Sequence, residues 1–192
     1  MRRALEHIRK MRGGAQAHLM RCDDAAYYIV KFQNNPQHLC ILANEMLGYQ
    51  LATALGLPVA RAEVVKVEAE LIDRTPELTI MKRGRPDKCL PGFHFGSRFP
   101  GQPGQVTVHD LLTDERLADV ANLADFAGML VFDQWTCNTN GRQVIFVAEP
   151  FRNQPYRALM IDQGFCFNAG EWNFPDSPLR GLYPRQRVYE SI

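Results

Sequence analysis

The sequence predicts an α+β protein, with strands prominent in residues 1–104 and helices in residues 105–192. Two observations lead to this fold class. Runs of β-branched and aromatic residues, separated by turn residues, fill the beginning of the chain. After residue 108, apolar residues recur at the spacing of a helix that buries one face. A chain of 192 residues can bury a real core as one domain or two small lobes, and we expect two lobes that divide near residue 104.

Composition and charge are those of an ordinary globular protein, since 46% of the residues are hydrophobic and 22% are charged. A formal net charge of +1 argues against a surface built entirely for nucleic acid. The beginning of the chain is nevertheless basic, because it carries several cations and Glu6 as the one acid: Arg2, Arg3, Arg9, Lys10 and Arg12. A basic N-terminal arm of this kind could contact phosphate groups.

Cysteine spacing and hydropathy both favour the cytoplasm. The five cysteines are odd in number and include no Cys-x-x-Cys pair, so their spacing predicts neither a disulfide framework nor a zinc site. No run of about 18 uncharged apolar residues is present, and the N-terminus lacks the apolar segment of a signal peptide. We therefore expect a soluble cytoplasmic protein with free thiols.

The first elements are two strands, at residues 18–22 and 27–32, which flank a turn and predict a hairpin. Gly13 and Gly14 precede them. Adjacent glycines permit positive φ and a close approach of the backbone, so their N–H groups could hold phosphate. A plain turn is the commoner role of such a pair.

A helix follows over residues 38–55, where apolar residues recur at helical spacing until Gly56 and Pro58 end it. Glu45 lies on or beside the apolar stripe, where a charge needs a partner. Lys31, on the preceding strand, is the partner we expect, although a solvated surface position for either residue is the simpler alternative. A strand is predicted over residues 59–69, whereas residues 73–105 are rich in Pro and Gly and favour no clear element.

Helical spacing returns with a short helix over residues 111–117 and a longer, buried helix over residues 117–135. Two short strands come next, at residues 144–147 and 157–161, and the second leads directly into Asp162. Asp133, Asn138 and Asp162 therefore place acid and amide oxygens at both ends of a small hairpin. Mg²⁺ prefers oxygen ligands, and phosphoryl-transfer sites hold it in this way, so the pattern predicts a nucleotide site.

Taken in order, these segments resemble the HipA-like serine/threonine kinase family, in particular its compact branch without the long N-terminal region. The resemblance runs through nearly the whole chain. It is carried by Gly14-Ala15-Gln16, Tyr27-Tyr28-Ile29-Val30-Lys31-Phe32, Ala43-Asn44-Glu45-Met46-Leu47, Leu55-Gly56-Leu57-Pro58-Val59, Phe93-His94-Phe95-Gly96-Ser97-Arg98, Phe132-Asp133-Gln134-Trp135 with Asn138, and Ile161-Asp162-Gln163-Gly164.

The resemblance implies a two-lobed protein-kinase-like fold, with a β-rich N-lobe over residues 1–104 and a mainly helical C-lobe over residues 105–192, which we expect to be truncated. ATP with Mg²⁺ would lie between the lobes, and the γ-phosphate would pass to a serine or threonine of an unidentified protein. The implied site residues are Gly13, Gly14 and Gln16 over the phosphates, Lys31 on the phosphates, Glu45 holding Lys31, and Asp162 on the metal.

The catalytic loop departs from the family pattern, which commonly reads Asn-x-Asp-Arg-x-x-x-Asn. The corresponding run here is Asn138-Thr139-Asn140-Gly141-Arg142-Gln143-Val144-Ile145, so Asn140 stands where the catalytic aspartate is expected. An amide cannot accept the hydroxyl proton as a carboxylate does. In a second register, Asp133 and Asn138 have the Asp-x-x-x-x-Asn spacing of kinase catalytic loops, which would put Asn138 on the metal. The structural alternative for Asp133 is a helix-end aspartate that bonds backbone or Arg142.

Three functions remain open from the sequence. The first is an active HipA-like kinase, indicated by Lys31, Glu45 and Asp162 in order. The second is a pseudokinase that binds a nucleotide or a protein partner without transfer, indicated by Asn140. The third is an interaction domain whose basic N-terminal arm contacts nucleic acid, which predicts salt-dependent binding.

Overall fold

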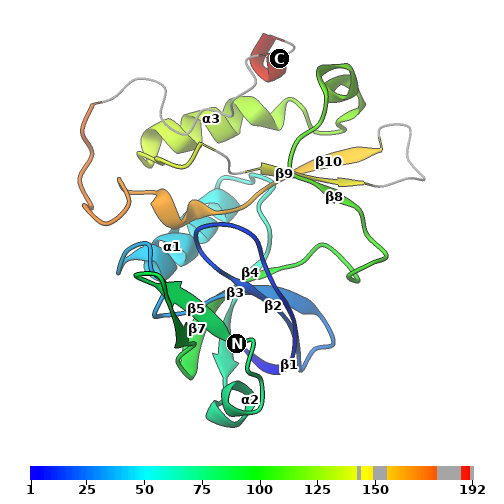
Figure 1. Ribbon diagram of the computed structural model, residues 1–192. Coiled ribbons are helices and arrows are strands. Elements are labelled where there is room, and N and C mark those ends of the chain that lie inside the picture. Colours follow the sequence, from blue (N-terminus) through cyan, green and yellow to red (C-terminus); the bar gives the residue numbers. More distant parts are fainter. Residues whose placement is uncertain (142–143, 149–154, 177–186, 191–192) are drawn as a thin grey trace. The chain divides into compact units, whose positions relative to one another are not determined.

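The computed structural model describes residues 1–141, 144–148, 155–176 and 187–190 (Figure 1). The chain forms two compact units, of which the first joins Met1–Ala43 to Arg61–Pro103 and the second joins Asn44–Ala60 to Gly104–Ile192. Helix α1 (Ile41–Ala54) begins in the first unit and continues in the second. Each unit has its own buried apolar cluster, as expected for parts that can each exclude water.

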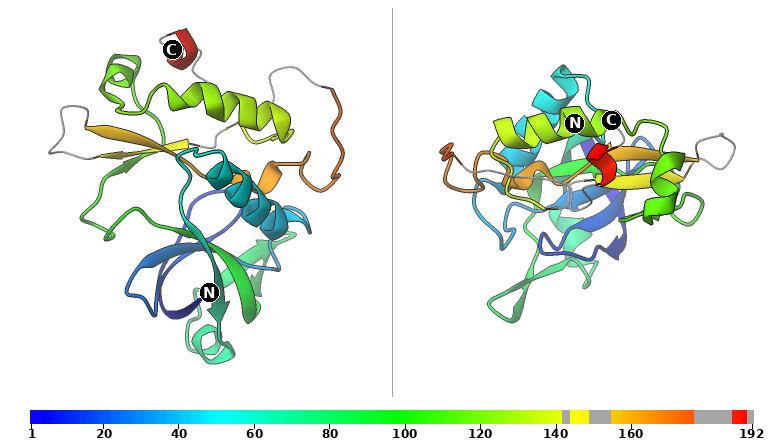
Figure 2. Two further views of the ribbon diagram at one scale, coloured as in Figure 1. Left: turned by 180° about the vertical axis from the view of Figure 1, so that it is seen from behind. Right: turned by 90° about the horizontal axis from the view of Figure 1, so that it is seen from above.

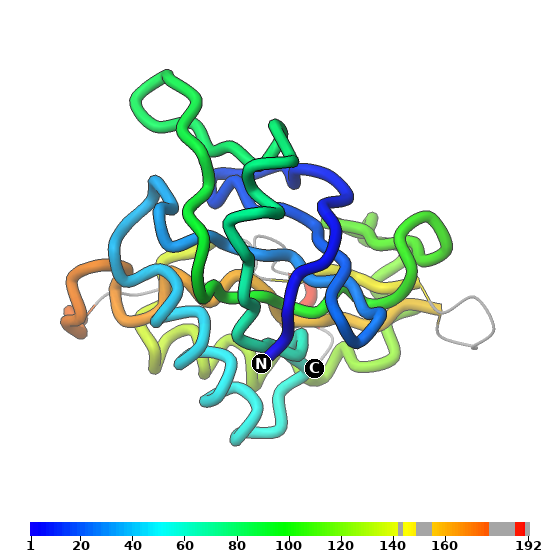
Figure 3. Tube along the Cα trace, turned by 90° about the horizontal axis from the view of Figure 1, so that it is seen from below, coloured from blue at the N-terminus to red at the C-terminus, as the bar shows by residue number. Residues whose placement is uncertain are grey.

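The first unit is built on a closed five-stranded barrel in the order β1-β2-β3-β7-β4. Its strands are β1 (Arg2–Lys10), β2 (His18–Cys22), β3 (Tyr27–Lys31), β4 (Ala62–Val67) and β7 (Gly92–Arg98). Neighbouring strands pair antiparallel except β1 and β4, which pair in parallel and close the barrel. Figure 3 traces these strands from the N-terminus. The predicted hairpin at residues 18–32 is confirmed, and it forms the β2–β3 pair.

The segment that the sequence left unassigned, residues 73–105, contributes three strands. The hairpin of β5 (Thr79–Lys82) and β6 (Arg85–Lys88) follows the short helix α2 (Ala69–Asp73). Strand β7 then pairs with both β3 and β4. Gly96 lies in its middle, and a Cβ atom there would stand 2.5 Å from Cγ2 of Val65. The close approach of two strands explains why a glycine interrupts the β pattern at this point.

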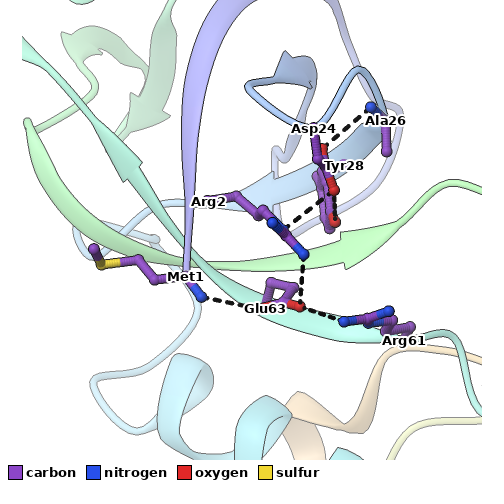
Figure 4. A network of polar contacts seen from close by, with 7 residues as sticks. All are labelled: Met1, Arg2, Asp24, Ala26, Tyr28, Arg61 and Glu63. Atoms are coloured by element: carbon purple, nitrogen blue, oxygen red, sulfur yellow. Dashed lines mark hydrogen bonds and ion pairs between the residues drawn. The ribbon is translucent and has the colours of Figure 1, made fainter.

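The basic start of the chain belongs to the barrel. The Met1 amine lies 3.1 Å from Glu63 Oε2, and Nε of Arg2 lies 3.2 Å from Oδ2 of Asp24 (Figure 4). The hydrogen bond from the Met1 amine, followed by that from Arg61, lowers the pKa of Glu63. The basic N-terminal arm is therefore a strand of the barrel, because residues Arg2–Lys10 form β1. Contact with nucleic acid through the exposed cations of this strand stays a prediction.

Two buried histidines make the first unit sensitive to acid. Burial lowers the pKa of His18 to about 4, with nearby His7 and Lys10 acting in the same direction, and burial lowers the pKa of His94 to about 4. An unfolded histidine titrates near 6.5, so the unfolded chain binds more protons than the folded one between roughly pH 6.5 and 4. Stability is therefore lost as the pH falls through this window, by roughly 3 kcal/mol per histidine at most.

Urea unfolding at pH 7 and pH 5 checks this expectation. His94→Gln should reduce the pH dependence, whereas His109→Gln, which changes a half-buried histidine of the other unit, should leave it unchanged. Equal unfolding free energies of the wild-type protein at the two pH values would contradict the assignment.

The second unit combines a three-stranded sheet with helices. The sheet has the order β10-β9-β8 and consists of β8 (Val108–His109), β9 (Val144–Ala148) and β10 (Tyr156–Met160). The helical elements of this unit after α1 are η1 (Asp114–Asp119), α3 (Asp125–Trp135), η2 (Gln163–Phe165) and α4 (Arg187–Glu190). The buried cluster includes Phe126 and Phe132 of α3 and Phe146 of β9. The predicted β9–β10 hairpin is confirmed, and the described residues hold fewer helices than a mainly helical lobe would.

The long helix expected over residues 117–135 begins only at Asp125. The reason is tertiary pairing along β10. Val120 forms a bridge with Tyr156, and Ala121 N donates to Tyr156 O at 2.8 Å. The Asn122 side chain then bonds both the N–H and the carbonyl of Ala158. These contacts hold Val120 extended and the following two residues in a turn, although their local pattern favours a helix.

The structure also bears on two expectations from the sequence, one about the cysteines and one about membrane-spanning helices. All five cysteines are free, which confirms the absence of disulfides. Within the described residues, every helix is too short or too polar to cross a bilayer.

Candidate functional site

Asp162 lies just beyond the end of β10, in a left-handed backbone conformation with φ 60° and ψ 52°. A non-glycine residue in this conformation is strained by on the order of 1 kcal/mol, and such residues concentrate at functional sites. Asp is among the residues that tolerate the left-handed region best. Its side chain is half-exposed, so the carboxylate can meet a ligand from solvent.

Asp133 lies near the C-terminal end of α3 and is almost completely buried. Its Oδ1 accepts a hydrogen bond of 2.8 Å from Asn138 Nδ2, and its main-chain carbonyl accepts one of 2.8 Å from Asn138 N. This geometry is that of the helix-end aspartate considered as an alternative, with Asn138 as a partner. Arg142, the other partner considered, lies outside the described residues.

Asn140 continues the same hydrogen-bonded chain. Its main-chain N–H donates to Oδ1 of buried Asn138 at 2.9 Å, and its Nδ2 donates to the main-chain carbonyl of Asp162 at 3.1 Å. Both ends of the Asn138 amide are thus engaged inside the loop. Asp133, Asn138, Asn140 and Asp162 are therefore brought together, as the two-ended hairpin predicted.

Glu45 joins this cluster from α1. Its side chain is 1% exposed, and its Oε2 accepts a hydrogen bond of 3.0 Å from the main-chain N–H of Gln163, the residue after Asp162. Glu45 is therefore buried and bonded to the main chain of Gln163, whereas the partner predicted for it was Lys31. Lys31 lies on β3 of the first unit and is also buried. The pairing of Lys31 with Glu45 stays a prediction.

The glycine turn of the first unit has the expected backbone freedom, since Gly13 has φ 119° and a Cβ there would meet open space. Gln16 is left-handed at φ 46°, and its main-chain N–H donates to Gly13 O at 3.1 Å. The Gln16 amide also bonds both main-chain groups of Met81, at 2.6 Å and 2.9 Å. The turn is therefore attached to β5, and the phosphate role of Gly13, Gly14 and Gln16 stays a prediction.

Three residues of the site were not assigned a role from the sequence: Asn44, Gly48 and Gln163. Asn44 is fully buried and bonds the segment after Asp162. Gly48 lies one turn further along α1, where a Cβ would stand 2.5 Å from Cβ of Gln163. The sequence signals for Asn44 and Gly48 were their residue types, an uncharged polar residue and a glycine in the middle of an apolar helix. Both types weaken a helix, so their presence there indicates a tertiary contact that requires them.

The donor set fits a metal that is shared with a nucleotide. Among the described residues, no group of three or more His, Cys, Asp or Glu side chains could hold a metal ion. Mg²⁺ is usually held by one or two carboxylates together with substrate phosphates, not by an all-protein cage. One half-exposed carboxylate just beyond a strand end, at Asp162, matches that pattern, whereas Asn138 is fully buried and both ends of its amide are bonded within the loop.

Comparisons with known proteins agree on a kinase relationship. A family model described as HipA-like kinase matches residues 5–164. No curated protein matches the sequence. A crystal structure of the Golgi casein kinase is similar at a TM-score of 0.53 and 13% identity, over 85% of this chain and 55% of that one. A second Golgi casein kinase structure, with Mn/ADP bound, gives a TM-score of 0.57 and 14% identity, over 98% and 61%.

These two likenesses bear on the fold alone, because the identities are low and the chain spans less than two thirds of either kinase chain. They show a kinase-like fold, which here is a mixed α and β structure with a β-rich region and few helices. The family match covers well over half of the chain and includes Glu45, the loop at Asp133 to Asn140, and Asp162. The chain therefore belongs to the HipA-like kinase family.

Proposed function

We propose that this chain is an ATP-dependent phosphotransferase that passes the γ-phosphoryl group of Mg-ATP to a serine or threonine hydroxyl of a protein. The observation that carries the proposal is the hydrogen-bonded cluster of the second unit, in which a chain of bonds runs from Asp133 through Asn138 and Asn140 to the Asp162 carbonyl, while Glu45 bonds the N–H of Gln163. Membership of the HipA-like kinase family supports it, as does the Mn/ADP bound to the similar Golgi casein kinase.

In this proposal the two parts of the chain act as an N-lobe, residues 1–104, and a C-lobe, residues 105–192. Asp162 would hold Mg²⁺, which when bound neutralises the charge that develops on the phosphates. Gly13, Gly14 and Gln16 would cover the phosphates, and Lys31 would bind them while Glu45 holds its ammonium group.

Proton acceptance distinguishes this site from a standard kinase site. Asn140 carries an amide that cannot take the hydroxyl proton, and Asp133 is buried with Oδ1 already bonded to Asn138. Phosphoryl transfer depends mostly on positioning and electrostatic stabilisation, so a bond from the acceptor oxygen to the γ-phosphorus can form while ADP leaves and the proton passes to solvent. Transfer should therefore be slow, with an intact requirement for Asp162.

A pseudokinase is the second candidate, and one contact favours it. The Asn140 amide donates to the Asp162 carbonyl, which gives this asparagine a structural role that requires no catalysis. Such a protein would bind Mg-ATP through the same residues and use the bound state to engage a protein partner.

Asn140→Asp separates the two candidates. A carboxylate at this position supplies a base, and general-base catalysis typically contributes about 10²–10⁴-fold, so we expect labelling of a protein acceptor by γ-³²P-ATP to rise at least about tenfold. Asn173→Asp, which changes an exposed asparagine of the same unit and keeps the oxygen that accepts from Asn168, is the control. Calorimetric binding of Mg-ATP with no labelling by wild-type or Asn140→Asp protein would favour the pseudokinase, and no binding at all would exclude both.

A further inference from the structure

The segment from Asp162 to Trp172 is unusually strained. Five of its non-glycine residues have a left-handed backbone: Asp162, Phe167, Asn168, Ala169 and Trp172, with φ between 50° and 60°. Three of them are consecutive. L-residues other than asparagine and aspartate rarely adopt this conformation, and they keep it only where surrounding contacts require it. Contacts with neighbouring residues must therefore hold this segment in its conformation.

Main-chain bonds from Phe167 N to Thr136 O and from Asn168 N to Cys137 O supply part of those contacts, and Asn44 of α1 supplies another part. Its Nδ2 lies 3.0 Å from the carbonyl oxygen of Gly164, 2.9 Å from that of Cys166 and 2.7 Å from that of Ala169. Its Oδ1 accepts a hydrogen bond of 2.9 Å from Trp172 Nε1. The partners fix the orientation of the amide, because three carbonyls need a donor and an indole N–H needs an acceptor.

Asn44 and Glu45 act on opposite ends of the same short element. Glu45 bonds the N–H of Gln163, at the start of η2, whereas Asn44 gathers the carbonyls that follow it. Figure 2 shows α1 beside the orange segment that contains η2. Glu45 and Asn44, two successive residues of α1, thus bond Gln163, the residue after Asp162, and the carbonyls of the turn that follows Gln163.

We propose that Asn44 is a positioning residue that keeps Asp162 in its metal-binding conformation. Its effect on metal rests on the proposed function, but its effect on the segment does not. With alanine at position 44, the carbonyls of Gly164, Cys166 and Ala169 lose the two N–H donors that they share, and the left-handed segment keeps only its main-chain bonds. Asp162 would then populate other backbone conformations, and its carboxylate would meet a bound metal for only part of the time.

The first test compares wild-type, Asn44→Ala and Trp172→Phe proteins by titrating Mg²⁺ against a fixed ATP concentration. We expect the Mg²⁺ concentration at half-saturation to rise at least tenfold in Asn44→Ala, while binding of ADP in EDTA stays within twofold. Trp172→Phe removes only the bond to Oδ1 and should shift the midpoint less than threefold. An unchanged midpoint in Asn44→Ala would overturn the proposal.

Relief of backbone strain at Ala169 provides a second test, because it should have no effect if Asn44 acts only by general packing. Glycine adopts the left-handed region without the steric penalty of alanine, so Ala169→Gly in the Asn44→Ala background should recover part of the Mg²⁺ dependence. If Asn44→Ala alone does not fold, recovery of a folded protein by Ala169→Gly supports the proposal. Two unfolded variants would make Asn44 a residue of the general fold and overturn the positioning role.

Hydrogen exchange separates this inference from the proposed function. Asn44→Ala should speed exchange of the amides at residues 163–169 at least tenfold, with the amides of α3 unchanged. That result together with no nucleotide binding by the wild-type protein would refute the kinase proposal and retain the positioning of the segment. Unchanged exchange at residues 163–169 would refute the positioning role whether or not nucleotide binds.

Discussion

Replacing Asp162 by alanine should remove most of the Mg²⁺-dependent affinity for ATP. The variant loses the half-exposed carboxylate at the end of β10 and the tolerance of aspartate for a left-handed backbone. We expect the dissociation constant of Mg-ATP to rise at least about tenfold, which corresponds to about 1.4 kcal/mol, and phosphoryl transfer to fall below detection. Calorimetry with and without Mg²⁺ measures the first effect, and incorporation of γ-³²P measures the second.

Two controls separate charge from backbone strain in this experiment. Asp162→Asn keeps a residue that accepts the left-handed conformation but removes the charge, so it should lose nearly as much Mg²⁺ dependence as alanine does. Glu171→Gln removes an exposed carboxylate from the same segment and should bind Mg-ATP as the wild-type protein does. If Asp162→Asn retained full Mg²⁺ dependence, the carboxylate would not be a metal ligand.

Gly48→Ala should destabilise the second unit, although alanine is the better helix former. The substitution gains about 1 kcal/mol of helix propensity. It also places a Cβ 2.5 Å from Cβ and 2.9 Å from Cγ of Gln163, atoms that lie close to the backbone and cannot swing away. Overpacking of this kind typically costs about 1–3 kcal/mol, so α1 and the segment after Asp162 must separate. We expect a net loss of up to about 2 kcal/mol in the free energy of unfolding, measured by urea denaturation.

Gly128→Ala in α3 is the matched control. A Cβ at this position would stand 2.8 Å from Cδ2 of Leu57, which is the far end of a flexible side chain and can move. The same helix-propensity gain should therefore leave the protein as stable as the wild type or more stable. Gln163→Gly in the Gly48→Ala background removes the opposing atoms and should recover part of the loss. Equal stabilities of Gly48→Ala and Gly128→Ala would show that the approach of α1 to Gln163 is not tight.

The site brings together residues that lie far apart in the sequence. Asp133, Asn138, Asn140 and Asp162 were predicted to meet because they flank one hairpin, and strands β9 and β10 do pair as expected. The contact of Asn44 with Gly164 joins residues 120 positions apart, and no local pattern indicates it. The bond from Gln163 to Glu45 spans a similar distance along the chain. The metal, phosphate and catalytic roles of these residues stay predictions until nucleotide binding is measured.

The order of most elements followed from the sequence alone. The β2–β3 hairpin, helix α1 and the β9–β10 hairpin depend on side-chain periodicity and turn residues, which are local properties of the chain. The family resemblance followed in the same way, since it needs only the succession of short segments. The division into lobes at residue 104 remains a prediction.

Tertiary structure decided the rest. Closure of the barrel by parallel β1 and β4, the start of α3 at Asp125 and the gathering of three carbonyls by Asn44 each depend on a partner distant in sequence. Local preference favours one conformation by a few tenths of a kcal/mol per residue, whereas a buried hydrogen bond left unmade costs about 1–3 kcal/mol. Where local preference and a buried hydrogen bond favour different conformations, as at residues 120–122, the chain adopts the conformation that makes the buried hydrogen bond.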